Sequence, residues 1–277
     1  VKRDVFTALT QACRADAVLA TNTSYLDPRQ IFAGLAHPQR FLGLHFFSPA
    51  QVMKLLEIVS TPDTDPAVLA TGFALARAMN KIPVRSGICD GFIGNRILKT
   101  TRAQAERLLL AGATPADVDG AMRAFGFAMG PFEAQDLGGL DIAAFQRQAA
   151  LARGETVFAP VAERLCAAGR LGQKTKAGWY DYPEGSRQGQ ASPVVESEIA
   201  KARAAAGFVT RSFTQSEILD AILLPMVNEG ACILQEGIAK RAVDIDLVKI
   251  HGYGFPRWQG GPMHWGMAQG LFVVVEK

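Results

Sequence analysis

The stretch "FLGLHFFSPAQVMKLLEIV", residues 41–59, holds two apolar runs, and each is interrupted by one ionisable side chain. His45 interrupts the first run and Glu57 the second. Short apolar runs of this kind favour buried strands. Only residues 47–53 separate "FLGLHF" from "KLLEIV", whereas a parallel crossover needs about a dozen residues or more. We therefore expect two neighbouring strands joined by a short loop, with His45 and Glu57 able to meet.

The cost of burying charge favours contact between these two side chains. An ionised carboxylate buried without a partner is costly, so Glu57 should find a donor, and an imidazole nitrogen is the obvious one. A carboxylate on one ring nitrogen fixes the tautomer and leaves the other nitrogen able to accept a proton. Such a pair is a competent general base near neutral pH. The same residues also fit a histidine that is merely satisfied in a core, and spacing alone does not decide between the two.

Short apolar strands alternate with helices on both sides of this stretch. Helical spacing runs through "VKRDVFTALTQACRADA", and the apolar "AVLAT" that overlaps its end is typical of a strand. Two further segments, "DPRQIFAGL" and "DPAVLATGFALARAMN", open with Asp-Pro as helices do, and "KIPVRS" follows as a strand. The alternation predicts an α/β layered domain up to about Ser86.

The rest of the chain has a helical pattern with a weak internal repeat. Residues 181–193 are rich in Gly, Pro, Ser and Gln and are the best linker candidate. The segments "AGATPADVDGAMRAFGFAMGPF" and "EGIAKRAVDIDLVKIHGYGFPRWQGGPM" share an order of helix, Gly, Asp-containing helix start, Gly-Phe turn and Gly-Pro. We interpret them as two copies of one helical module, the alternative being chance similarity between Ala-rich helices.

Composition excludes several classes of protein. The 277 residues leave room for two domains, and the net charge of +3 is spread without a Lys/Arg block, which argues against nucleic-acid partners. No apolar run is long enough for a transmembrane segment. The four cysteines form no CxxC pair, and no His/Asp/Glu cluster has metal-ligand spacing, so no metal site is expected. No GxSxG motif is present, and His37 and His264 are expected in a loop and an aromatic turn.

Three segments carry a family resemblance. In this order and spacing, "ATNTSYL", "GLHFFSPAQVMKLLEIV" and "DGFIGNRIL" resemble the L-3-hydroxyacyl-CoA dehydrogenase family. The segment "LGQKTKAGWYDY" resembles the close of the family's helical domain. The segment "GYGFPRWQGGPMHW" resembles the second helical repeat of multifunctional members, which join an enoyl-CoA hydratase to the dehydrogenase.

The resemblance implies an α/β fold: the C-terminal part of a Rossmann-type nucleotide-binding domain, followed by two related all-helical domains. The expected ranges are 1–87 for the partial NAD-binding domain, 88–182 for the first helical domain, 183–213 for a linker and 214–277 for the second helical domain. The last run, "LFVVVEK", ends inside what the pattern predicts to be a structural element, so we expect a piece of a longer polypeptide.

The resemblance also implies roles for the central residues. His45 would be the catalytic base, which takes the 3-hydroxyl proton as hydride leaves C3 for the nicotinamide, and Glu57 would be its carboxylate partner. Asn95 would hold the substrate near the histidine. From the residues alone, Asn95 also fits a simple helix cap.

Other site residues follow from the same resemblance. Ser24 would contact both substrate and cofactor, although a turn residue after a strand would look the same. Lys2 and Ser48 would lie beside the cofactor, and His251 could touch the acyl chain.

One departure concerns the cofactor. The implied cofactor is NAD, but the GxGxxG fingerprint that belongs to the first strand–turn–helix of this family is absent from the 277 residues. We therefore expect the chain to begin midway through the nucleotide-binding domain and to bind NAD poorly by itself.

The implied partners are an acyl-CoA substrate, a hydratase domain in the same polypeptide and a thiolase. The expected compartment is the bacterial cytoplasm, or a peroxisome or mitochondrion in a eukaryote. Two other functions stay open: a non-catalytic acyl-CoA-binding or assembly module, and an NAD-dependent dehydrogenase of hydroxy acids that carry no CoA.

Overall fold

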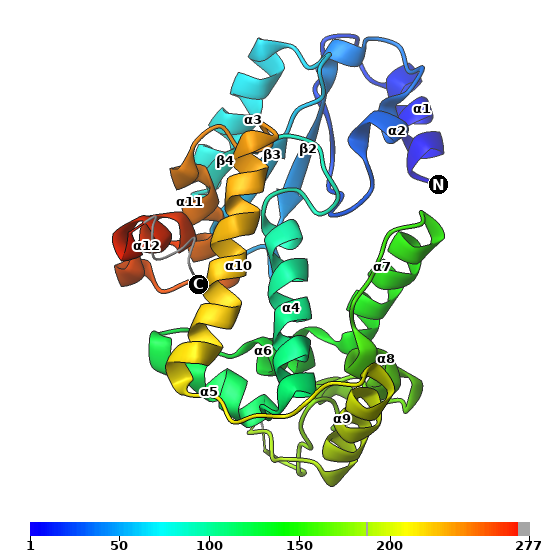
Figure 1. The fold of residues 1–277 in the computed structure, drawn as a ribbon. Coiled ribbons are helices and arrows are strands. Elements are labelled where there is room, and N and C mark those ends of the chain that lie inside the picture. Colours follow the sequence, from blue (N-terminus) through cyan, green and yellow to red (C-terminus); the bar gives the residue numbers. More distant parts are fainter. Residues whose placement is uncertain (187, 271–277) are drawn as a thin grey trace. The chain divides into compact units, whose positions relative to one another are not determined.

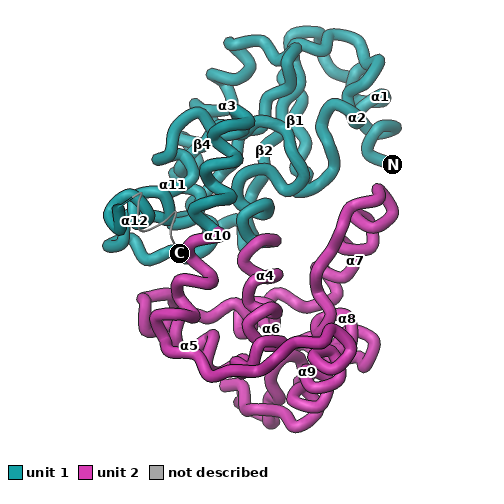
Figure 2. The backbone as a smooth tube through the Cα atoms, in the orientation of Figure 1, with its two compact units in different colours: residues 1–98, 226–276 teal, residues 99–225, 277 magenta. Residues whose placement is uncertain are grey.

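The computed structural model describes residues 1–186 and 188–270, and the chain divides into two compact units (Figures 1 and 2). Among the described residues, the first unit comprises residues 1–98 and 226–270, and the second comprises residues 99–186 and 188–225. The final run, for which the sequence predicts a continuing element, falls in residues 271–277 and lies outside the described residues.

A four-stranded sheet in the order β1-β2-β3-β4 forms the centre of the first unit. Its strands are β1 (Leu19–Thr21), β2 (Phe41–Phe46), β3 (Leu55–Val59) and β4 (Ile82–Ser86). The pairs β1–β2 and β3–β4 are parallel, whereas β2 and β3 are antiparallel. All four strands agree with the sequence prediction to within two residues at their ends, and the predicted short connection between β2 and β3 is confirmed.

Helices surround this sheet within the first unit. They are α1 (Lys2–Ala12), α2 (Pro28–Phe32), the 3-10 turn η1 (Pro38–Arg40), α3 (Pro66–Ala78), α11 (Ala242–Tyr253), the 3-10 turn η3 (Arg257–Gln259) and α12 (Pro262–Gln269). The long helix α4 (Gly94–Ala111) begins in this unit, and α10 (Gln215–Gln235) ends in it. The helices predicted around residues 1–17, 27–35 and 65–80 are confirmed as α1, α2 and α3.

The two faces of the β2–β3 pair carry different kinds of side chain. Leu42 and Leu44 pack with Leu56, Ile58 and Ala76 of α3 in one buried cluster. Because successive side chains of a strand point to opposite faces, His45 and Glu57 lie on the other face. Each buried leucine or isoleucine contributes about 1.5–3 kcal/mol, so the apolar face fixes the register that brings the two ionisable side chains together.

The second unit is helical. Its elements are α5 (Pro115–Phe125), α6 (Pro131–Gly138), α7 (Leu140–Ala152), α8 (Pro160–Ala167), the 3-10 turn η2 (Gln173–Thr175) and α9 (Pro193–Ala206), with the end of α4 and the start of α10.

Helix α9 corrects part of the domain prediction, because it occupies residues 193–206 of the range 183–213 expected as a linker. Pro193 opens the helix, and Val195, Ile199 and Ala202 recur at helical spacing and are buried, with α8 as a packing neighbour. The Gly- and Ser-rich composition thus ends before the helix. The structure also groups residues 226–270 with the sheet, because α11 packs on β3 and β4.

Each of the two helical segments has a buried aspartate with the same kind of contact, which supports the interpretation of two copies of one helical module. Asp119 of α5 accepts hydrogen bonds of 3.0 and 3.1 Å from two N–H groups at the start of α6. Asp246 of α11 accepts bonds of 2.7 and 3.3 Å from two N–H groups at the start of α12. Each helix start follows a Gly-Pro pair, and its first N–H groups have no partner within their own helix. In both copies, an aspartate of one helix therefore caps the start of the next helix.

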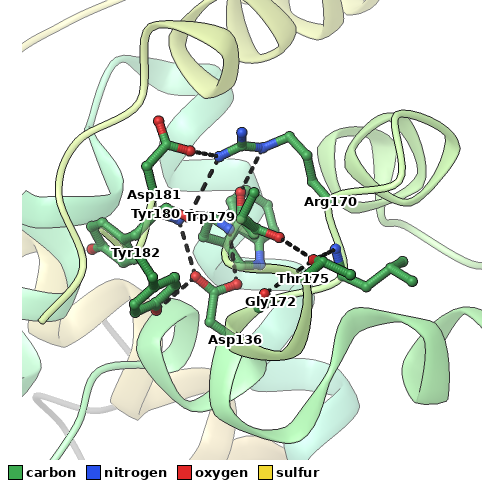
Figure 3. A network of polar contacts seen from close by, with 11 residues as sticks. Asp136, Arg170, Gly172, Thr175, Trp179, Tyr180, Asp181 and Tyr182 are labelled. Atoms are coloured by element: carbon green, nitrogen blue, oxygen red, sulfur yellow. Dashed lines mark hydrogen bonds and ion pairs between the residues drawn. The ribbon is translucent and has the colours of Figure 1, made fainter. Parts of the chain in front are cut away.

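A second buried carboxylate organises the end of the first copy (Figure 3). Asp136 of α6 accepts bonds from the N–H groups of Trp179 and Tyr180, at 2.8 and 3.0 Å, and from the hydroxyl of Tyr182 at 2.9 Å. Arg170 donates to the carbonyl of residue 178 and pairs with Asp181 at 2.7 Å. These contacts fold the "GWYDY" segment onto α6.

Substitution of Gly130 tests the first of these carboxylate contacts. A Cβ at Gly130 would lie 2.3 Å from the Cα of Asp119, so Gly130→Ala should lower the free energy of unfolding by about 1–3 kcal/mol. A Cβ at Gly120 in α5 would meet no atom within 4 Å beyond its chain neighbours and the backbone of its own helix, and Gly120→Ala should gain about 0.5–1 kcal/mol in helix propensity. Urea unfolding measures both, and equal effects of the two substitutions would contradict this account.

Buried carboxyls should also make the stability pH-dependent. Burial raises the pKa of Glu106 to about 7, of Asp119 to about 7 and of Asp136 to about 6. Because these values exceed the ordinary ones of about 4, the folded chain binds more protons than the unfolded chain in this window. The free energy of unfolding should therefore fall as pH rises from about 4 to about 8. Urea unfolding across this range measures the slope, and Asp136→Asn should flatten it; an unchanged slope would count against the titration of Asp136.

Candidate active site

The candidate site is centred on His45 and Glu57, which lie directly opposite one another in the antiparallel pair of β2 and β3. Nδ1 of His45 lies 2.7 Å from Oε2 of Glu57. The His45 side chain is 4% exposed and the Glu57 side chain is fully buried. The predicted contact between the two residues is confirmed.

Helix α4 completes the environment of the carboxylate. The N–H of Gly94, the first residue of this 18-residue helix, donates to Oε1 of Glu57 at 3.1 Å. Helix N-termini present unpaired N–H groups and a partial positive charge, and both stabilise an anion. Both oxygens of Glu57 are therefore engaged. With Nδ1 of His45 held by Glu57, Nε2 is the ring nitrogen available for proton exchange.

The turn before α4 has an unusual backbone that places two groups at once. Phe92 is buried and has a φ of 51°, in the left-handed region that non-glycine residues seldom adopt. The centroid of its ring lies 5.7 Å from that of His45, and the centroid of the Phe47 ring lies 4.5 Å from that of His45. Strained conformations of this kind persist where surrounding contacts determine them. Here the turn packs a ring against His45 and aims the Gly94 N–H at Glu57.

Asn95, the next residue of α4, has a partner that the sequence did not indicate. The hydroxyl of Tyr253, the last residue of α11, donates to Oδ1 of Asn95 at 2.8 Å. His251, which the resemblance places in the site, lies two residues earlier and is half-buried, and burial together with Arg257 lowers its pKa. The signal for Tyr253 was an aromatic residue between two glycines in "GYGF".

The edge of the sheet near His45 also carries the residues expected beside the cofactor. Strands β1 and β2 run parallel and end at this edge. Nζ of Lys2 donates to the carbonyl of Asn22 at 3.0 Å, and burial lowers the pKa of Lys2. Ser24 is half-buried in the loop after β1, and Ser48 is exposed in the loop after β2.

Asn22 is a second residue that sequence reasoning missed. Its Oδ1 accepts a bond of 3.2 Å from the N–H of Phe46, which joins the loop after β1 to the end of β2. The polar run "TNTS" was its only signal.

Comparison with protein families finds two matching domains. Residues 1–89 match the 3-hydroxyacyl-CoA dehydrogenase NAD binding domain, and residues 91–182 match the 3-hydroxyacyl-CoA dehydrogenase C-terminal domain. The chain belongs to the 3-hydroxyacyl-CoA dehydrogenase family. The match confirms the predicted α/β fold class. It also confirms NAD as the cofactor of this family.

Curated relatives are longer than this chain. It is 40% identical over 291 residues to the peroxisomal bifunctional enzyme of Homo sapiens, covering 100% of this chain and 40% of that protein. It is 34% identical to the peroxisomal fatty acid beta-oxidation multifunctional protein AIM1 of Arabidopsis thaliana, covering 100% of this chain and 39% of that protein. The chain thus spans about 40% of the length of these relatives.

Solved structures of the family resemble the chain. The dehydrogenase part of multifunctional enzyme 1 from C. elegans is 30% identical with a TM-score of 0.66, covering 92% of this chain and 58% of that one. The 3-hydroxybutyryl-CoA dehydrogenase from Escherichia coli is 25% identical with a TM-score of 0.82, covering 99% of this chain and 73% of that one.

The residues present fit one end of the family's cofactor. Dinucleotides bind outside the carboxyl ends of parallel strands, and here that edge offers the amide of Asn22 and the ammonium of Lys2. The 277 residues hold no GxGxxG motif for the diphosphate. Polar groups at this edge therefore suit the nicotinamide end of NAD.

Arg96 anchors the helix that carries Gly94 and Asn95. Its guanidinium pairs at 2.5 Å with Glu229 of α10 and at 2.5 Å with Glu236, the residue that follows α10. The hydrogen bonds to these two carboxylates raise the pKa of Arg96. The start of α4 is thereby fixed against the part of α10 that belongs to the same unit.

A cavity of about 250 Å³ lies at the opposite edge of the sheet, beyond the end of β3. Its lining comprises Arg29, Ser60, Thr61, Pro62, Arg85, Gly87, Ile88, Gly237, Ile238 and Lys240. None of the residues expected in the site from the sequence lines this cavity, so we place the candidate site at His45.

Among the described residues, no group of three or more His, Cys, Asp or Glu side chains is arranged to hold a metal ion. No helix in that part of the chain is long and apolar enough to cross a membrane.

Removing the Glu57 carboxylate should destabilise the fold. Glu57→Ala leaves both the Gly94 N–H and Nδ1 of His45 without an acceptor in a buried region, and we expect a loss of about 3 kcal/mol in the free energy of unfolding. Glu57→Gln keeps one acceptor oxygen and should lose less. Thermal and urea unfolding measure both; a Glu57→Ala chain as stable as the native one would show that the carboxylate contributes nothing to folding.

Proposed function

We propose that this chain is the dehydrogenase portion of a multifunctional fatty-acid oxidation protein. The reaction is the NAD-dependent oxidation of (3S)-3-hydroxyacyl-CoA to 3-ketoacyl-CoA, or its reverse. The buried His45–Glu57 pair carries the proposal, because a fixed imidazole with one available nitrogen suits removal of a hydroxyl proton.

In the proposed reaction His45 is neutral at the start. Its Nε2 takes the proton of the 3-hydroxyl group; NAD⁺, when bound, would supply the acceptor for the hydride of C3. Glu57 then stabilises the imidazolium that has formed, and its own charge is held by the Gly94 N–H. The rings of Phe47 and Phe92 shield the imidazole from water, which strengthens the attraction between the two charges.

The remaining residues bind and orient. We assign Asn95 to the substrate carbonyl, Lys2 and Ser48 to the cofactor, and Ser24 to both molecules. Two of these residues lie near the end of β2, which supports their roles: Ser48 follows the strand, and Lys2 contacts Asn22, whose amide accepts from Phe46. His251 on α11 is assigned to the acyl chain.

The relatives' names suggest the wider context. They include bifunctional and multifunctional enzymes of peroxisomes, so we propose a hydratase domain in the same polypeptide and a thiolase that consumes the ketoacyl product. The compartment, bacterial cytoplasm or eukaryotic peroxisome or mitochondrion, stays a prediction.

Turnover of the full-length protein that carries this chain tests the mechanism. His45→Ala and Glu57→Gln should each lower kcat by about 10²–10⁴-fold, with the Kd of the CoA ester changed only a few-fold, because the base acts on the proton rather than on binding. His37→Asn is the matched control, since His37 is exposed and has a φ of 58° that asparagine tolerates. NADH formation from 3-hydroxybutyryl-CoA is the measurement, and near-native kcat in either site variant would rule the mechanism out.

The choice of substrate separates the two other candidate functions. Turnover of free 3-hydroxybutyrate but not of its CoA ester would indicate a hydroxy-acid dehydrogenase. Tight binding of the CoA ester with no NADH formed by the native protein would indicate a non-catalytic binding module.

A further inference from the structure

A hydrogen bond from Tyr253 holds the oxygen of the Asn95 side-chain amide, a group that the proposed function uses to bind the substrate. A side-chain amide has an oxygen that accepts and a nitrogen with two protons to donate. The Tyr253 hydroxyl occupies Oδ1 of Asn95 at 2.8 Å. The nitrogen of Asn95 must then point away from Tyr253, with its donors available for another acceptor.

Three contacts hold the Tyr253 ring in place. A Cβ at Gly94 would lie 2.3 Å from the ring, so the backbone of α4 and the ring can approach this closely only because residue 94 is glycine. The ring of Phe47 meets it edge-on at 5.4 Å, and Nζ of buried Lys249 lies 4.3 Å from its centroid. Such cation–π and aromatic contacts stabilise one orientation of a ring. The hydroxyl is therefore presented to Asn95 from a rigid support.

Those contacts connect Tyr253 to the catalytic pair as well as to Asn95. Phe47 also packs on His45, and Gly94 donates to Glu57. Tyr253 thus contacts one neighbour of His45 and one neighbour of Glu57, although it lies on α11, in the second copy of the helical module.

We propose that Tyr253 is a positioning residue: its hydroxyl orients the Asn95 amide so that the N–H donors face a carbonyl oxygen of the acyl-CoA substrate. The inference rests on the proposed function. Without the hydroxyl, the amide of Asn95 can rotate and present its own oxygen to the substrate carbonyl, and two acceptors repel one another. The second copy of the module therefore supplies a group to the site.

Tyr253→Phe in the full-length protein is the direct test, because it keeps the ring and its packing and removes only the hydroxyl. We expect a loss of roughly 3- to 10-fold in kcat/KM for 3-hydroxybutyryl-CoA, which is about 0.7–1.4 kcal/mol and within the range of an ordinary hydrogen bond. The KM for NAD and the melting temperature should stay close to native. Unchanged kcat/KM would overturn the proposal.

A double-mutant cycle shows whether Tyr253 acts through Asn95. In an Asn95→Ala background, Tyr253→Phe should cost less than about 2-fold, because the group it orients is gone. A loss in that background equal to the loss in the native background would mean that Tyr253 acts by another route, and would also overturn the proposal.

A measurement independent of turnover separates this proposal from the proposed function. The side-chain ¹⁵N–H₂ pair of Asn95 can be assigned by its disappearance in Asn95→Ala, and it should shift and broaden in Tyr253→Phe. If that change occurs while the native protein turns over no hydroxyacyl-CoA, the orientation stands and the proposed function fails. If the amide signals are the same with and without the hydroxyl, the orientation itself is wrong.

Discussion

The buried carboxylate of Glu57 is the constraint on which the candidate site depends. An ionised group without exposure to water must have its oxygens occupied, and here one meets His45 and the other the first N–H of α4. These two partners come from separate elements, so satisfying one side chain fixes strand β2 and helix α4 relative to β3. Arg96 then ties the same helix to Glu229 of α10 and to Glu236 just after it. The position of the proposed base is thus a consequence of what a buried carboxylate requires.

Charge burial recurs in this chain with a different outcome. Asp119, Asp136 and Asp246 each accept backbone N–H groups at the start of a helix or in a turn, and each is satisfied mainly by the backbone. Asp119 and Asp136 each also accept a tyrosine hydroxyl, whereas Glu57 differs in that one of its partners is an imidazole. A carboxylate held by peptide groups can only stabilise structure. A carboxylate held by an imidazole also changes what that imidazole can do, and this difference separates the site from the structural caps.

Sequence patterns predicted the local part of this arrangement and missed the part that depends on distant contacts. Apolar runs and a short connection were enough to place β2 beside β3 and His45 opposite Glu57, because strand parity and burial cost are local rules. The Asp-Pro starts predicted α2 and α3 for the same reason. Tyr253 lies 158 positions from Asn95, and no periodicity connects residues so far apart. The left-handed Phe92 was likewise hidden, since its conformation comes from packing against His45 and not from its own preference.

The second helical copy repeats the capping of the first but differs at the end of α11. Asp246 accepts N–H groups at the start of α12 as Asp119 does at the start of α6. At the end of α11 the chain places Tyr253 between two glycines. Gly252 and Gly254 matter for different reasons. A Cβ at Gly252 would lie 2.5 Å from Leu55 of β3, whereas Gly254 ends the helix with a φ of 70°. Close approach on one side and a left-handed turn on the other hold the tyrosine at the sheet, next to the turn that carries Asn95.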